Sequence, residues 1–154
     1  MSLEKVRELF IKENLEDRIV EFNSSSATVE LAAEQIGCSS SQIAKTMSFK
    51  SKDDYAILIV TKGSSKIDNR KFKDYFKMKA KMLKRDEVEE YVGHLPGGVC
   101  PFAVKENCKV YLDISLKEHE EVYPAAGSAS SVVKLNLEEL QKLSNYIEWI
   151  DVCI

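Results

Sequence analysis

The sequence predicts an α+β domain built on a curved, mixed β-sheet or barrel that helices wrap. Helical and strand patterns are intermixed along the chain without the regular period of a βαβ protein. The run Ala56-Ile57-Leu58-Ile59-Val60 is apolar on both faces, which is typical of a strand at the centre of a sheet. The length of 154 residues, with 44% hydrophobic and 31% charged residues, suits a single globular domain over residues 1–154.

Five segments have helical patterns, and three of them carry signals for their ends. Ser2 can cap the first helix, and Ser26-Ala27-Thr28 opens the second, which Gly37 can end in the left-handed conformation. Asn136 caps the last helix, and two glutamates follow in its first turn, where they complement the helix dipole. We expect helices at residues 3–14, 29–36, 68–76, 86–92 and 137–144, with a further helical turn at 39–43.

Strand patterns fill most of the remaining chain. Residues 77–82 alternate strictly, so we expect a strand there with its lysines outward and its methionines inward. Residues 93–101 hold three glycines and two prolines and are expected to form a loop with a constrained backbone. Further strands are expected at 18–22, 43–49, 55–61, 109–112, 121–125, 132–135 and 146–152.

Positive charge is concentrated in one part of the chain. Residues 62–85 hold ten basic and two acidic residues, a net +8, whereas the other 12 basic and 23 acidic residues give −11. An asymmetry of this size indicates a polyanionic partner, but a run of charge also fits an ordinary solvated face. Charge alone leaves both interpretations open.

Composition argues against several classes of protein. No run approaches the ~18 apolar residues that span a bilayer, and the first residues lack the layout of a signal peptide. We therefore expect a cytoplasmic protein with no membrane partner. The four cysteines form no Cys-x-x-Cys pair and only two histidines are present, so we expect no disulfides, no metal and no other cofactor.

Two segments are candidates for a site. Lys45 lies in a predicted strand between apolar residues, where its ammonium can contact a phosphate or a carbonyl group, or its stem can simply cover apolar surface. The run Gly97-Gly98-Val99-Cys100-Pro101 pairs two glycines. Paired glycines let a backbone approach a ligand and offer amide donors to an oxyanion, or they merely form a tight turn.

A cysteine-dependent hydrolase is an unrelated alternative. Cys100 could act as a nucleophile with His94 as its base, but the sequence supplies no third group to orient the histidine. A cysteine before proline is commonly structural. We therefore predict that Cys100 is not catalytic.

Five segments in register resemble the YbaK/prolyl-tRNA-synthetase-associated editing-domain family, over nearly the whole chain. Each motif is weak alone, and their order along the chain makes the resemblance specific. The segments are Thr28 to Cys38, Gln42-Ile43-Ala44-Lys45-Thr46 through Phe49, Gly97 to Pro101, Val110-Tyr111-Leu112-Asp113 and Ala125-Ala126-Gly127-Ser128.

The resemblance implies the fold of that family and hydrolysis of the ester between a mischarged amino acid and the terminal adenosine of tRNA. It implies a positioned water, with no metal and no covalent intermediate. Lys45 would orient the terminal phosphate or the aminoacyl group, and the backbone of the Gly97–Pro101 loop would position the water or the ester carbonyl. The implied catalytic residues are Lys45, Gly97, Gly98 and Pro101, and the implied pocket residues are Thr46, Ala125, Ala126 and Gly127.

Two spatial expectations accompany this interpretation. The Lys45 ammonium should lie in a concave pocket within a few ångströms of the Gly97–Pro101 loop. The +8 segment should be the surface that docks tRNA, with Lys77, Lys79 and Lys81 as its central contacts.

The substrate and the partners stay open at this stage. Residues 125–132 lack the Lys-Arg-Gly-Leu-Asp-like run of the family's Cys-tRNA deacylases, so small residues there would suit alanine or serine instead. A non-catalytic accessory module that binds tRNA or a synthetase is the alternative to an enzyme. The sequence does not identify the amino acid removed, the tRNA isoacceptor, the oligomeric state or the need for a synthetase partner.

Overall fold

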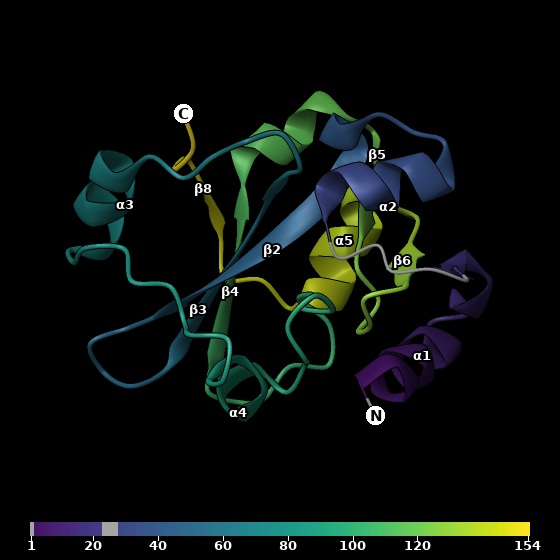
Figure 1. Ribbon diagram of the computed structural model, residues 1–154, viewed down its shortest axis with the longest axis horizontal. Helices are drawn as coiled ribbons and strands as arrows, with labels where there is room; N and C mark the ends of the chain where they lie inside the picture. The colour runs from purple at the N-terminus through teal and green to yellow at the C-terminus, as the bar shows by residue number, and fades with distance from the viewer. Residues whose placement is uncertain (1, 23–27) are drawn as a thin grey trace.

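A curled six-stranded half-barrel sheet organises the protein, as seen in a computed structural model that describes residues 2–22 and 28–154 (Figure 1). Its strand order is β7-β5-β2-β3-β4-β8, with parallel and antiparallel pairs mixed. A separate two-stranded sheet pairs β1 with β6. The strands are β1 Ile19–Glu21, β2 Ile43–Lys50, β3 Ala56–Lys62, β4 Cys108–Asp113, β5 Glu121–Pro124, β6 Ser131–Val133, β7 Leu135–Asn136 and β8 Trp149–Ile150.

Five α-helices of the described chain pack around this sheet, and predicted signals mark the ends of two of them. The Thr28 hydroxyl accepts from the Leu31 amide at the start of α2, and Gly37 ends it in the left-handed conformation with φ 81°. Asn136 and Glu139 form a complete capping box at the start of α5. The helices are α1 Ser2–Lys12, α2 Val29–Ile36, α3 Asn69–Phe76, α4 Val88–Val92 and α5 Leu137–Ser144, with 3₁₀ turns at Glu16–Arg18, Ser40–Gln42 and Ile114–Glu118.

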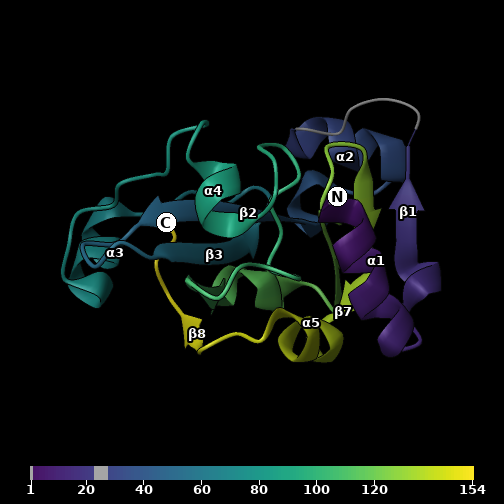
Figure 2. The same cartoon turned by 90° about the horizontal axis from the view of Figure 1, so that it is seen from below.

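The two faces of the sheet pack against different helices (Figure 2). Leu58 and Val60 of β3 face a large core that includes side chains of α1, α4 and α5. Ile57 and Ile59, which alternate with them, face a smaller core that includes Phe72 of α3. The central position predicted for β3 is confirmed, since its first six residues are all buried.

Residues 77–82 do not form the predicted strand. Lys77 ends α3 in the left-handed conformation with φ 58°, and the chain that follows meets β2 only through a bridge between Met82 and Phe49. Met82 is 57% exposed, and Leu83 takes the inward position instead. Alternation predicted two faces correctly as far as Ala80. A strand also needs a hydrogen-bonded neighbour, and among the described residues this segment meets β2 only around Met82, through the Lys81 carbonyl and the Leu83 amide.

Smaller differences concern the ends of elements. The strand predicted at 146–152 is only Trp149–Ile150, and the one predicted at 132–135 is divided between β6 and β7. Part of the predicted opening of the second helix, Ser26-Ala27, lies outside the described residues. Within the described residues, none of the helices has both the length and the apolar composition needed to cross a bilayer.

Candidate functional site

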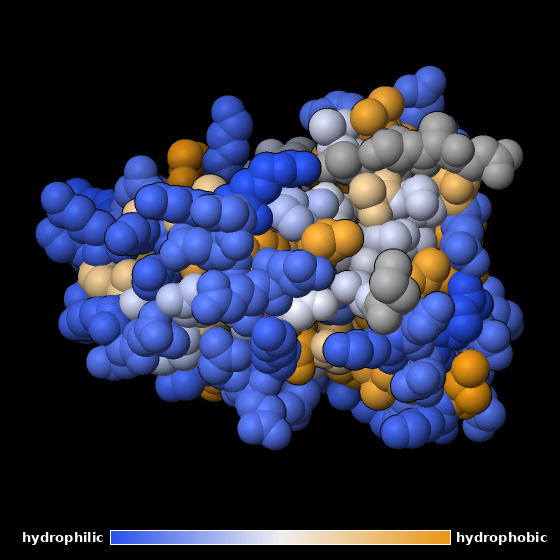
Figure 3. Space-filling view, turned by 60° about the horizontal axis from the view of Figure 1, so that its bottom comes forward, coloured by the Kyte–Doolittle hydropathy of each residue, from blue (hydrophilic) through white to orange (hydrophobic). Residues whose placement is uncertain are grey.

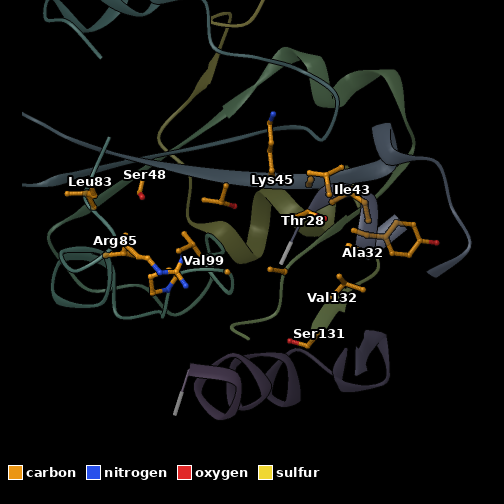
Figure 4. Close-up of a pocket in the computed structure, with 18 of the residues that line it drawn as sticks. Thr28, Ala32, Ile43, Lys45, Ser48, Leu83, Arg85, Val99, Ser131 and Val132 are labelled. Atoms are coloured by element: carbon orange, nitrogen blue, oxygen red, sulfur yellow. The ribbon is translucent and has the colours of Figure 1, made fainter. Parts of the chain in front are cut away.

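A pocket of about 350 Å³ lies beside β2 and brings together segments that are far apart in the sequence (Figure 4). One wall is β2 itself, and the opposite wall includes Pro96, Gly97 and Val99. The N-terminal half of α2 and the end of β5 complete it. The lining residues are Thr28, Val29, Ala32, Ile43, Ala44, Lys45, Thr46, Ser48, Met82, Leu83, Arg85, Val88, Pro96, Gly97, Val99, Tyr123, Ala125, Ser131 and Val132.

The glycine loop contributes to the pocket through only part of its length. Gly97 lines the pocket and has φ 92°, a conformation that a glycine adopts without strain. Gly98 instead packs against backbone, since a Cβ added there would lie 2.7 Å from the Ser128 nitrogen and 2.8 Å from the Gly127 carbonyl carbon. Pro101 lines a separate groove on the other side of the loop, beside α1 and the end of α5. The close contact of Gly98 with residues 127–128 therefore fixes the position of the neighbouring Gly97.

Lys45 lines the same pocket, but its ammonium does not approach the glycine loop. The side chain points away from the other lining residues, and its Nζ donates to the backbone carbonyl of Ser65 (Figure 4). Burial lowers the pKa of this ammonium. The expectation that the ammonium lies within a few ångströms of the Gly97–Pro101 loop is wrong. The physical reason is strand parity, because successive side chains of β2 point to opposite faces.

The parity of β2 directs hydroxyl groups into the pocket. Thr46 and Ser48 both line it, and Ser48 points toward the side on which Arg85 lies (Figure 4). The Thr46 Oγ1 atom is buried and has no hydrogen-bond partner among residues 2–22 and 28–154. Met47 and Phe49, which alternate with them, pack into the small core on the opposite face.

The pocket segment implied at residues 125–127 is shorter than expected. Ala125 lines the pocket, whereas Ala126 is fully buried in the large core. Gly127 has φ 96° and faces the start of α1, because an added Cβ would lie 2.9 Å from the backbone of Ser2. Ser131 and Val132 of β6 line the pocket in their place.

Arg85 is the functional candidate that sequence reasoning missed. It lies between the buried Leu83 and α4, and its guanidinium reaches under β2 toward Val99 (Figure 4). The sequence presents it only as the last of ten basic residues, and no local signal separates it from the others. Lys45 and Arg85 are the two charged residues among the described lining residues, so the pocket wall is cationic and holds no carboxylate or imidazole.

The exposed lysines Lys77, Lys79 and Lys81 lie outside this pocket. Hydrophilic side chains largely cover the end of the molecule that α3 forms (Figure 3). In the described part of the chain, none of the three lysines forms an ion pair, whereas Lys62 pairs with Glu118 and Lys71 with Asp151. The regular spacing that alternate residues of a strand would give these three lysines does not apply, because the segment is not a strand.

Cys100 and His94 are close together but are unsuited to nucleophilic catalysis. The Cys100 Sγ lies 3.5 Å from His94 Nε2, and both side chains are fully buried. Burial raises the pKa of the thiol to about 12. His94 Nε2 lies 2.7 Å from the Phe102 carbonyl oxygen, which can only accept, so this nitrogen carries the proton and cannot take one from the thiol.

Replacing Cys100 by serine is therefore expected to leave most of any esterase activity, within about twofold of the parent in kcat. The hydroxyl occupies less space than the thiol, so a fall of about 1 kcal/mol in unfolding free energy is expected. Steady-state kinetics with an aminoacyl ester, together with urea unfolding, measure both quantities. Mass spectrometry of a quenched reaction provides a second check, and an acyl group found on Cys100 would contradict the prediction.

The fold and the pocket together define a class of protein: a small α+β half-barrel with a cationic pocket that a glycine loop closes. The chain belongs to the aminoacyl-tRNA editing domain family, whose model matches residues 23–143. The uncharacterized protein YwhH of Bacillus subtilis (strain 168) is 50% identical over 153 residues, covering 99% of this chain and 98% of that protein.

Two further relatives carry functional descriptions of their own. EbsC of Enterococcus faecalis (strain ATCC 700802 / V583), described as a candidate Cys-tRNA(Pro)/Cys-tRNA(Cys) deacylase, is 24% identical over 119 residues, covering 77% of this chain and 73% of EbsC. A solved structure described as a candidate trans-editing enzyme for prolyl tRNA synthetase has a TM-score of 0.88 and 25% identity. That match covers 99% of this chain and 97% of the solved one. The curved α+β fold expected from the resemblance is confirmed.

Proposed function

We propose that this protein hydrolyses the ester of mischarged aminoacyl-tRNA with a positioned water and without a covalent intermediate. The observation that carries the proposal is the chemistry of the pocket wall. Its charged residues within the described chain are Lys45 and Arg85. Arg85 reaches into the cavity that Gly97 also lines, whereas the Lys45 ammonium points away from the cavity toward the Ser65 carbonyl. A wall with cations and without carboxylates suits a substrate whose ester lies one nucleotide from a backbone phosphate.

In this proposal Arg85 and Lys45 both contribute to binding phosphate. Arg85 points into the pocket and can hold a phosphate oxygen through two N–H groups. The Lys45 ammonium is half-buried, donates to the neutral carbonyl of Ser65 and forms no ion pair with any described residue. A phosphate at the rim of the pocket would be a better partner for this cation, and rotation of the lysine side chain would bring the two together.

The glycine loop supplies the catalytic backbone groups. Gly97 lines the pocket in a left-handed conformation, and Gly98 fixes this turn against residues 127–128. Because the Gly98 amide already donates to the Leu95 carbonyl at 3.0 Å, we propose the Gly97 amide as the donor that serves the ligand. Amide groups held in this way can position a water and stabilise the developing oxyanion. An aminoacyl ester is already activated, so no side-chain nucleophile is required.

Part of the pocket lining consists of small side chains. Ala44, Thr46 and Ala125 line the pocket, and EbsC is described as a candidate Cys-tRNA(Pro)/Cys-tRNA(Cys) deacylase. We therefore propose alanine, serine and cysteine as the substrate class.

The decisive experiment screens the purified protein against a panel of mischarged tRNAs and against the corresponding aminoacyl-adenosine esters. An editing enzyme will hydrolyse esters of small amino acids faster than those of large ones. Binding of tRNA without turnover on any ester would instead support an accessory module that delivers tRNA or contacts a synthetase.

We also propose that Lys77, Lys79 and Lys81 dock the tRNA backbone. Changing all three to glutamate is expected to weaken tRNA binding and to reduce the slope of log affinity against log salt by roughly 0.7 to 0.9 for each lost phosphate contact. Hydrolysis of the minimal aminoacyl-adenosine ester is expected to stay within twofold. Filter binding at several salt concentrations measures the slope.

The matched control changes Lys5, Lys12 and Lys142 to glutamate, since these lysines lie on α1 and α5, away from residues 77–81. This control alters net charge by the same amount. Equal losses in both variants would mean that total charge, and not the surface at residues 77–81, attracts tRNA.

A further inference from the structure

The outer edge of β2 is open at one residue, and that residue is Thr46. On one side of it, β2 pairs with β5 as far as Ala44. On the other side, the Ser48 carbonyl accepts from the Leu83 amide at 3.1 Å, and the Lys50 amide donates to the Lys81 carbonyl at 2.8 Å. Between these two contacts no described segment pairs with this edge of β2.

The direction of the Thr46 backbone groups follows from the strand ladder. In an antiparallel pair, residues alternate between those whose N–H and C=O point to the partner strand and those whose groups point away from it. Ser48 and Lys50 point their groups away from β3, to the outer edge. Thr46 has the same parity, so its N–H and C=O also point to the outer edge, beside the pocket that it lines.

The open edge has the size of a single amino acid. From Ala44 to Ser48 the strand advances four residues, or about 13 Å, which leaves room for one residue between the flanking contacts. A hydrogen-bonded antiparallel pair exchanges both of its bonds between one residue on each strand. An α-amino ester carries the same donor and acceptor as a strand residue, on either side of its α-carbon.

We propose that Thr46 binds the aminoacyl group as an added strand would, with both of its backbone groups. The α-amino group donates to the Thr46 carbonyl, and the ester carbonyl accepts from the Thr46 N–H. The scissile carbon then faces the wall that Gly97 forms, where the water is positioned. The buried, unpartnered Thr46 Oγ1 lies on the same residue and is a second polar group available to the ligand.

This inference rests on the proposed function and adds a recognition rule to it. The two backbone groups contact only atoms that all α-amino acids share, so they select an α-amino ester whatever its side chain. Side-chain selection is left to the rest of the pocket. Because the N–H of Thr46 contacts the ester carbonyl oxygen, Thr46 also polarises the carbonyl group that the water attacks.

The first test removes the Thr46 N–H and keeps the Thr46 side chain. The α-hydroxy analogue of threonine, placed at position 46, turns that amide into an ester and leaves the side chain intact. The kcat for alanyl-adenosine is expected to fall about 100-fold, as for the loss of one oxyanion donor. The same replacement at Lys50 is the control, because it removes an edge hydrogen bond of β2 outside the pocket. Equal kcat values for the two backbone esters would overturn the proposal.

The second test removes the α-amino group from the substrate. Propionyl-adenosine lacks only that group relative to alanyl-adenosine. After division by the rate of each ester in buffer, its kcat/KM is expected to be at least about tenfold lower. Equal normalised values would overturn the bond to the Thr46 carbonyl.

A binding measurement separates this inference from the proposed function. The non-hydrolysable probe is 3′-alanylamino-3′-deoxyadenosine, and the readout is the backbone amide spectrum of the ¹⁵N-labelled protein. The Thr46 amide proton is expected to shift the most among the β2 amides. If the protein binds the probe in this way but hydrolyses no ester, the proposed catalysis fails and the binding mode holds. If it hydrolyses esters while Thr46 does not shift, the binding mode fails alone.

Discussion

Replacing either cation of the pocket wall, Arg85 or Lys45, by alanine is expected to lower kcat/KM for an aminoacyl-tRNA by about 10- to 100-fold. The estimate follows from the loss of one charge-assisted hydrogen bond to phosphate in each variant. Arg85 belongs to no hydrophobic core, so its removal is expected to change the unfolding free energy by no more than about 0.5 kcal/mol. Lys45→Ala also removes the hydrogen bond to the Ser65 carbonyl, so a loss of about 1 kcal/mol is expected there. Single-turnover deacylation and urea unfolding measure the two effects.

The two side chains differ in orientation, and this difference predicts the effect of a conservative replacement at Arg85. Arg85 already points into the pocket, so Arg85→Lys is expected to recover only part of the activity, since an ammonium cannot bind phosphate through two parallel bonds. Arg70→Ala controls for the loss of one positive charge from the +8 segment, because Arg70 is an exposed arginine of α3 that does not line the pocket. Unchanged turnover in Lys45→Ala, with loss in Arg85→Ala, would mean that the lysine has a structural role through the Ser65 carbonyl.

The helices were predictable because their signals are local. The cap of α2 at Thr28 and the capping box of α5 satisfy backbone groups within one turn of the chain, so the sequence alone is enough to locate them. The error at residues 77–82 has the opposite origin. Alternation describes side chains, whereas a strand is defined by the hydrogen bonds of a neighbour, and this neighbour is reached only at Met82.

The segments that form the site could be predicted, but the orientation of their side chains could not. A resemblance to known editing domains pointed to Lys45 and to the glycine loop, and both segments line one pocket. Whether the ammonium or the Thr46 hydroxyl faces the loop depends on the register of β2 in the sheet, which no single-strand pattern contains. The place of Arg85 in the pocket could not be predicted for a related reason. Like the basic residues next to it, Arg85 is exposed, so exposure does not identify it as a pocket residue.

The glycine loop leads to the second large effect, in Gly98→Ala. A Cβ at this position would lie 2.7 Å from the Ser128 nitrogen and 2.8 Å from two further backbone atoms, and a backbone cannot rotate aside as a side chain can. The loop and residues 127–128 must therefore separate. We expect a loss of about 1 to 3 kcal/mol in unfolding free energy, as for other overpacked sites. We also expect kcat to fall about 100-fold, because Gly97 would move relative to Thr46 by a distance that matters for a positioned water.

The kcat of Gly98→Ala could fall because the protein is less stable or because the loop has moved. Gly37→Ala, which is expected to lower stability without moving the loop, distinguishes these two causes. Gly37 has φ 81° with nothing within 4 Å of an added Cβ, so alanine there introduces left-handed strain of about 1 to 2 kcal/mol without a clash. Gly37 ends α2 and does not line the pocket, so its variant is expected to be destabilised and still active. The comparison is made at a temperature where both variants are folded. If Gly98→Ala then turns over as fast as Gly37→Ala, the water is not positioned by the glycine loop, and catalysis depends on the β2 wall and the two cations instead.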